Sequence, residues 1–225
     1  MNVLPSPGPR RWSAISLARG LLAVACLLAA SGCSVLGSTQ RDPVTLYAPA
    51  VHVAPDPAWP KVGWQLALLP ATSAPVIDTS RIAVRPTPDE LQVYRGAAWT
   101  QPARGLVEDA VLRTLEDSGR IGAVARLETG LRADFKLALD VRRFEADYAG
   151  QPLPAATVEV SAKLLDARDQ RVVASRVFLH AQPATGTAVP AVAAAFGQAL
   201  DALAGDIAGW TLASGQADTH ARLRP

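Results

Sequence analysis

A long alternation of apolar and polar residues in the second half of the chain constrains its fold more than any other feature. Between Asp134 and Tyr148, every second residue from Phe135 to Val141 is apolar, and the residues between them are mostly charged. A two-residue period is that of a β-strand with one buried face. The phase shifts by one residue at Arg143-Phe144, which predicts a β-bulge or a strand end there.

A second alternating segment follows and predicts a β-hairpin. Apolar residues recur at every second position from Ala156 to Leu164, and the polar run DARDQ at Asp166–Gln170 has turn composition. Strand character resumes over Arg171–His180. Two strands joined by a polar turn indicate a hairpin, and we expect Asp134–Tyr148 to pair beside it as a meander.

Two segments have helical periodicity instead. Apolar residues spaced by three and four predict a helix over Trp99–Asp117, with Gly119 as its stop. A second stripe begins after Thr187, the expected N-cap or its neighbour, with Pro190 in the first turn. That stripe comprises Val189, Val192, Ala193, Phe196, Leu200, Leu203, Ile207 and Trp210. Residues 213–225 are polar and aperiodic, which predicts a flexible tail.

The remaining strands are short, and together the elements indicate an α/β fold. The expected short strands are Val44–Tyr47, Trp64–Leu69, Arg81–Arg85, Leu91–Tyr94 and Ile121–Arg126. A mixed β-sheet with a C-terminal hairpin, covered by two amphipathic helices in a three-layer domain, buries every apolar stripe. We place this domain at residues 61–212.

The N-terminal segment predicts an export signal with a lipid attachment site. Basic residues precede the apolar run Leu21–Ala30, which is too short for a bilayer core that needs roughly 20 residues. The run ends in AASGC, similar to the lipobox of bacterial lipoproteins, so residues 1–32 are the expected signal peptide and Cys33 the expected acylated residue. Cys26 is a poorer second candidate, and an ordinary secretory signal followed by a free cysteine is the alternative.

Cleavage before Cys33 would leave a domain on a Pro-rich tether at residues 33–60. Proline favours extended backbone, and the stretch from Ser34 to Trp59 could reach at most about 90 Å. The formal net charge of +2 becomes −1, because three arginines and no acids are removed. Such a balance does not indicate a nucleic-acid partner. Ser34 follows the cysteine, and in bacterial lipoproteins this resembles a signal for transfer to the outer membrane.

No arrangement of residues in the sequence predicts catalysis, a cofactor or a metal site. His52, His180 and His220 are scattered, and no pair has metal-ligand spacing. Asp166 and Asp169 have the composition of a turn, and Arg142-Arg143 has that of a solvated strand pair. Trp99 and Trp210 lie on the helical stripes and are expected in the core, whereas Trp59 and Trp64 suit either packing or a lipid groove. A binding or coupling role is therefore favoured over an enzyme.

The order of these segments resembles the ABC-type transport auxiliary lipoprotein family, the PqiC-like lipoproteins. The resemblance covers roughly Leu46 to Leu212 and is strongest at ADFKLALDVRRFEADY, residues 133–148. Its other parts are the segments Thr45–Tyr47, Leu66–Pro70, Ile77–Arg85, Leu91–Tyr94, Ala97–Leu115, Val158–Phe178 and the closing helix ending near Trp210.

The resemblance implies a role that the residues alone do not give. Such lipoproteins resemble outer-membrane accessory subunits of transport systems that contain MCE-domain proteins and inner-membrane components. The cargo of these systems is lipid or another apolar molecule. The oligomeric state stays open, a homo-oligomer included. The alternative is a lipoprotein that regulates cell-wall synthesis or assembles a secretion pore on a related α/β domain.

Overall fold

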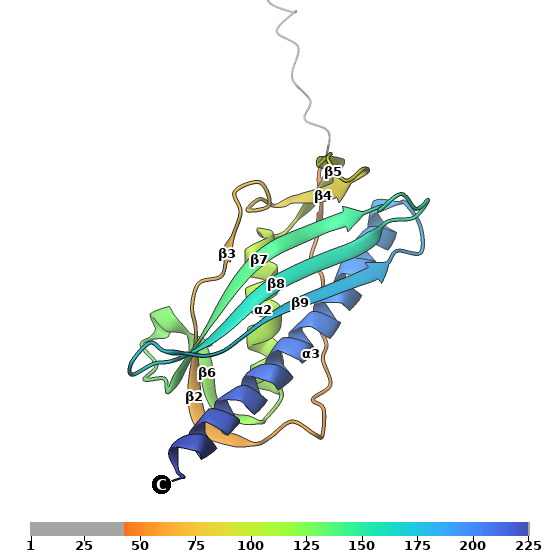
Figure 1. The fold of residues 1–225 in the computed structure, drawn as a ribbon. Helices are drawn as coiled ribbons and strands as arrows, with labels where there is room; N and C mark the ends of the chain where they lie inside the picture. The colour runs from red at the N-terminus through yellow and green to blue at the C-terminus, as the bar shows by residue number, and fades with distance from the viewer. Residues whose placement is uncertain (1–42, 225) are drawn as a thin grey trace, which may run out of the picture. The chain divides into compact units, whose positions relative to one another are not determined.

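A computed structural model describes residues 43–224, and Figure 1 shows their fold. The predicted signal peptide, residues 1–32, and the predicted acylation site lie outside the described residues. The first half contains β1 (Thr45–Tyr47), β2 (Val62–Leu68), β3 (Thr72–Ser73), β4 (Arg81–Arg85), β5 (Gln92–Trp99) and α2 (Ala103–Asp117). The second half contains β6 (Ile121–Arg126), the 3₁₀-helix η2 (Leu127–Thr129), β7 (Phe135–Asp147), β8 (Ala155–Asp166), β9 (Val172–Pro183) and α3 (Val189–Arg222).

The long strand β7 organises a mixed, nine-stranded sheet. Along one edge it pairs with β8, which forms an antiparallel hairpin with β9. Along its other edge β7 pairs in parallel with β2, β3 and β4 in succession. β6 lies beside β2, while β5 and then β1 extend the sheet from β4. The predicted meander is confirmed, and the register shift between Val141 and Arg143 confirms the predicted bulge.

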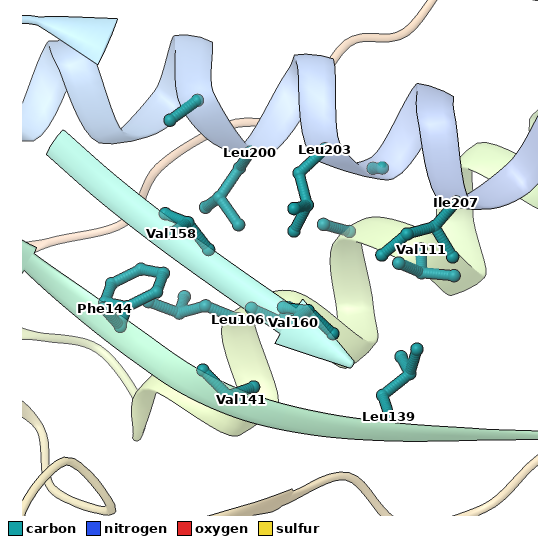
Figure 2. Packing of buried hydrophobic residues seen from close by; sticks show 14 of the residues in the cluster. Leu106, Val111, Leu139, Val141, Phe144, Val158, Val160, Leu200, Leu203 and Ile207 are labelled. Atoms are coloured by element: carbon teal, nitrogen blue, oxygen red, sulfur yellow. The ribbon is translucent and has the colours of Figure 1, made fainter. Parts of the chain in front are cut away.

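Both helices pack on the same face of this sheet. Leu139 and Val141 of β7 and Val158 and Val160 of β8 point toward them (Figure 2). The side chains that meet these four are Leu106 and Val111 of α2 and Leu200, Leu203 and Ile207 of α3. The two helices also contact each other. All of these side chains belong to one continuous core.

The mixed sheet, the two amphipathic helices and the C-terminal hairpin are as predicted, but the layering differs. The domain has two layers instead of three, because the helices share one core. The opposite face of β7 and β8 bears charged side chains such as Asp140, Arg142 and Lys163, which are exposed. Val177 and Leu179 of β9 are apolar on this face but about half exposed, so no third layer covers them within residues 43–224.

The predicted start of the first helix is wrong by four residues. Trp99 is the last residue of β5, and α2 begins at Ala103 after Pro102. Proline disfavours helical backbone in the residue before it, so Gln101 cannot continue a helix into Pro102. Trp99 is nonetheless in the core, as expected, where its ring lies 5.7 Å from Phe144 and 5.0 Å from Phe196.

The prediction of a flexible tail over residues 213–225 is also wrong, since α3 continues through Arg222. Gly215 is buried, and a Cβ placed there would come within 2.6 Å of the Trp64 ring. The polar end of α3 is therefore ordered by contacts with β2 that its own periodicity does not reveal. At the other end of α3, the N-cap is Ala188, the neighbour of Thr187, and no side chain caps the helix. Pro190 lies in the first turn, as predicted.

α3 is the one helix in the described part of the chain whose length and hydropathy would suit a membrane span. Half of its most apolar window is buried inside the domain. The apolar stripe of α3 thus packs against the sheet and α2, as expected for a core helix.

Candidate anchor and docking surfaces

The folded domain begins close to the predicted acylation site. β1 pairs in parallel with β5, and the Thr100 N–H donates to the carbonyl of Tyr47, so residues 45–47 are part of the sheet. About ten residues separate Cys33 from this point, which span at most ~35 Å when fully extended. Cys33 itself lies outside the described residues.

The segment 48–60, which we call the strap, lies along α3. Val51, Val53 and Trp59 are partly buried against the core, and the His52 N–H donates to Asp201 Oδ1 at 2.8 Å. The prediction of a free tether is therefore wrong over residues 48–60, whereas the short strand predicted at 44–47 is confirmed as β1. Proline makes this segment extended, as expected, but its alternate apolar side chains hold it on the domain.

Glycines on α3 make room for the strap. Gly197, Gly205 and Gly209 lie in a row with Asp201, each four residues from the next. A Cβ at Gly205 would approach Val53 Cγ1 to 3.3 Å, and one at Gly209 would approach Trp59 Nε1 to 2.5 Å. The strap thus lies in a shallow channel along the helix that a Cβ at Gly205 or Gly209 would obstruct.

A buried carboxylate joins β4 to β7 on the face away from the helices. Glu145 is 2% exposed and accepts hydrogen bonds from Arg85 Nε and Arg143 Nε, both at 2.8 Å. Arg143 also donates to Asp147 at 2.6 Å. Burial raises the pKa of Glu145, but the two guanidinium groups outweigh it and hold this pKa below its ordinary value.

The sequence interpretation of Arg142-Arg143 as a solvated pair holds for one residue only. Arg142 is exposed and has contacts of 3.7 Å to Asp140 and to Glu159. Arg143 lies after the bulge, which turns it toward Glu145. A two-residue period cannot show which of two adjacent arginines a bulge redirects.

A second ionic cluster ties the hairpin turn to the end of α3. Asp166 is 1% exposed, accepts the Arg168 N–H at 2.7 Å and pairs with Arg222. Arg171 in the same turn donates to Asp218 at 2.8 Å. Burial raises the pKa of Asp166, but these donors outweigh it and hold the pKa below its ordinary value. Asp166 is a turn residue, as predicted, and also a buried anchor for α3.

The three histidines lie apart. His52 is on the exposed side of the strap, His180 of β9 lies 3.0 Å from Asp206 of α3, and His220 contacts Gln216. Within residues 43–224, no group of three His, Cys, Asp or Glu side chains is arranged to hold a metal ion. The His180–Asp206 contact joins a strand to a helix 26 residues later, so sequence spacing gave no signal of it.

The four tryptophans of this region have separate packing roles. Trp64 packs edge-on against Phe135 at 5.0 Å, and Trp210 packs against Phe178 at 5.6 Å. Trp99 is in the aromatic core, and Trp59 lies on the strap. Trp64 lines a cavity of about 340 Å³ together with Arg168 and Arg222. The other lining residues are Asp134, Phe135, Thr219 and Leu223, so the cavity lies beside the ionic cluster at the end of α3.

Two crystal structures of other proteins are similar to this domain. A crystal structure of protein XCC0632 from Xanthomonas campestris is 58% identical, with a TM-score of 0.76 over 79% of this chain and 99% of that one. Another crystal structure, of an uncharacterized protein, shares the fold at 13% identity, with a TM-score of 0.58 over 74% of this chain and 97% of that one.

A curated relative also matches, as does a family model. Uncharacterized protein bll6063 of Bradyrhizobium diazoefficiens is 26% identical over 156 residues, which are 69% of this chain and 41% of that protein. The chain therefore spans less than half the length of that relative. The model of the ABC-type transport auxiliary lipoprotein component matches residues 45–208, from β1 into α3. The chain thus belongs to the family of ABC-type transport auxiliary lipoprotein components.

Proposed function

We propose that this protein is an outer-membrane-anchored periplasmic lipoprotein that serves as a non-enzymatic accessory subunit of an intermembrane transport system. The single observation that carries the proposal is the family match over residues 45–208, downstream of a cysteine at the end of a short apolar run. Its partners would be an MCE-domain protein and inner-membrane transport components, and its cargo lipid or another apolar molecule.

The geometry suits a coupling part fixed at one end. In Figure 1, β4 and β5 lie at one end of the domain and the C-terminus lies at the other. β1 pairs with β5, so the chain from the proposed acylation site enters at the first of these ends. α3 has 34 residues and is about 50 Å long, which separates the two ends. An anchor at the β1 end would leave the far end free to meet a partner.

Acylation is tested by replacing each candidate cysteine in turn. We expect Cys33→Ala to abolish the acyl mass on the mature N-terminus and retention in the outer membrane, with the domain still folded. Cys26→Ala is the matched control and should keep both. Mass spectrometry of the mature N-terminus and membrane fractionation give the readouts. A Cys33→Ala protein that stays acylated in the outer membrane would contradict the proposal.

The partner is tested by crosslinking in the cell envelope. The acylated protein should be recovered with an MCE-domain protein, and the recovery should fall for Cys33→Ala, which is no longer held at the membrane. Recovery of a cell-wall synthase or a secretion pore subunit in place of the MCE-domain protein would favour the alternative role.

A further inference from the structure

We infer that the outer face of the β1–β5–β4 corner is a contact surface for phospholipid headgroups, on which the anchored domain rests. This inference rests on the proposed acylation of Cys33 and adds to it a second contact with the same membrane. We call the surface the β1 patch, and it consists of Val44, Leu46, Arg81, Val93 and Arg95.

Apolar side chains are exposed in the patch where an edge strand usually carries charge. β1 is the last strand of the sheet on this side. Val44 is 56% exposed, Leu46 62% and Val93 40%. Natural edge strands are commonly protected by charge, proline or a covering element. The uncovered apolar residues are Leu46 on the edge strand, Val44 directly before it and Val93 on the neighbouring strand β5. Clustered apolar residues of this kind mark contact surfaces.

The strand register puts these side chains on one face with two arginines beside them. Leu46 lies opposite Ala98, and Ala98 lies opposite Arg81, so Leu46 and Arg81 flank one cross-strand row. The adjacent Trp99 points to the core, so this row points away from it. Val44 shares the face of Leu46, since the two are separated by two residues.

The same reasoning places the other two members of the patch. Val93 lies opposite Ala83, which is outside the core cluster although Ile82 and Val84 are in it. Arg95 is exposed on the same strand, two residues from Val93. Neither Arg81 nor Arg95 has an ion-pair partner among residues 43–224, whereas Arg85 and Arg104 are both paired.

The chemistry of the patch matches the interface of a bilayer. Apolar side chains insert at the boundary between headgroups and acyl chains, and arginine donors bind lipid phosphates. Of the acidic residues near the patch in the described chain, Asp78 is paired with Arg104, and Asp89 and Glu90 lie in the β4–β5 turn beyond Val93. Leu46 and Arg81 lie at the opposite end of the β4–β5 pair, so the acidic turn does not neutralise the arginine there.

The length of chain between anchor and patch selects the lipid surface over other occupants. Val44 follows Cys33 by 11 residues in the sequence, and the intervening chain reaches at most about 40 Å. The strap follows β1 and is held on α3, so it does not lengthen the connection between Cys33 and the patch. A surface tethered this closely meets the membrane at high effective concentration, so a weak patch is sufficient.

A fluorescent label on the patch tests its burial in the acylated protein. Because both natural cysteines lie before the described domain, Leu46→Cys supplies one free thiol for a nitrobenzoxadiazole label. In vesicles of phosphatidylethanolamine and phosphatidylglycerol, we expect its emission to rise severalfold and to be quenched by doxyl-labelled lipids. Leu223→Cys, whose native leucine is 75% exposed at the far end, is the control and should not change. An equal change of emission for the labels at the two positions overturns the inference. So does an emission at Leu46→Cys that changes with the number of protein molecules per vesicle and not with the lipid.

A second measurement separates this inference from the proposed acylation. The Cys33→Ala chain has no anchor, so its partition onto the same vesicles reports the patch alone. Leu46→Asp should lower that partition about fivefold, since an apolar side chain loses its burial. Val172→Asp, at a valine 49% exposed on β9, should leave it unchanged within twofold. Equal partition of the two variants overturns the patch even if Cys33 is acylated. If Cys33 carries no acyl mass, the proposed anchor fails independently of this result.

Discussion

Glu145 shows how a single buried charge is held in this domain. Its carboxylate is almost fully buried and has two guanidinium partners from different strands, β4 and β7. Removing one partner of a buried ion pair leaves the other charges desolvated and uncompensated. The cost is moderated here because the side chains of Arg85 and Arg143 are 26% and 32% exposed.

We expect Glu145→Gln to lower the free energy of unfolding by about 2 kcal/mol at pH 7. Urea unfolding monitored by circular dichroism measures this value. Glu159→Gln, on the same face with a contact of 3.7 Å to Arg142, is the matched control and should cost less than about 0.5 kcal/mol. Equal losses in the two variants would contradict the role of the network.

Glu145 also makes the stability of the domain depend on pH. The pKa of Glu145 is lower in the folded protein than in the unfolded chain. Its contribution is therefore present above the ordinary glutamate pKa of about 4.3 and is lost as pH falls through the folded value. Wild type should lose stability below about pH 4.3 more steeply than Glu145→Gln, as measured by thermal unfolding across that range. Parallel pH profiles would show that Glu145 titrates normally.

At the scale of elements, the strap and α3 fit each other through glycine. A helical glycine replaced by alanine usually gains up to about 1 kcal/mol, because alanine has the higher helix propensity. Gly209 cannot realise that gain, since an added Cβ would meet the ring of Trp59. Gly197 can, because the Ala50 carbonyl oxygen, its nearest neighbour, would lie 4.0 Å from an added Cβ.

Gly209→Ala should displace Trp59, whereas Gly197→Ala should not. For Gly209→Ala we expect a red shift of tryptophan emission and faster proteolysis within residues 48–60. Gly197→Ala should keep the wild-type spectrum and gain about 0.5–1 kcal/mol of stability. Two variants with the same emission and the same cleavage rate would mean that the strap is not seated on Gly209.

The last turns of α3 are ordered by the hairpin turn. Arg222 pairs with both Asp166 and Asp218, and Asp166 is 1% exposed. Arg222→Ala should cost about 1–2 kcal/mol, because Asp166 loses its less exposed cation and keeps only the Arg168 N–H and the exposed Arg168 guanidinium at 3.5 Å. Arg224→Ala, two residues further along and exposed, should be neutral. Chemical denaturation compares the two, and a neutral Arg222→Ala would contradict the pairing.

At the scale of the whole molecule, the folding unit begins at residue 43 and not at residue 61. Residues 43–224 belong to one compact unit. A chain starting at residue 43 should unfold at the same urea midpoint as the Cys33→Ala mature chain. A chain starting at residue 61 loses β1 and the strap, which bury parts of Tyr47, Val51, Val53 and Trp59, and should lose about 3 kcal/mol or more. Equal midpoints for the two shortened chains would show that these residues do not contribute to stability.

Much of the fold could be predicted from the sequence, because local periodicity reports the burial of one face. The alternation in β7 and β8 predicted the hairpin and the bulge, and the residues predicted for the stripe of α3 are buried or partly buried. Segments stabilised by distant partners were missed. The strap depends on glycines about 150 residues away, and the end of α3 depends on Trp64 and Asp166.

The sequence by itself determined the element types, the family resemblance and the nomination of Cys33, since each depends on neighbours along the chain. The tertiary structure alone decided that the helices share one face, that Arg143 turns toward Glu145, and that the predicted tether is a strap. These features depend on contacts between residues far apart in the chain. Such contacts leave no period in a single sequence, because their free energy appears only when distant side chains meet.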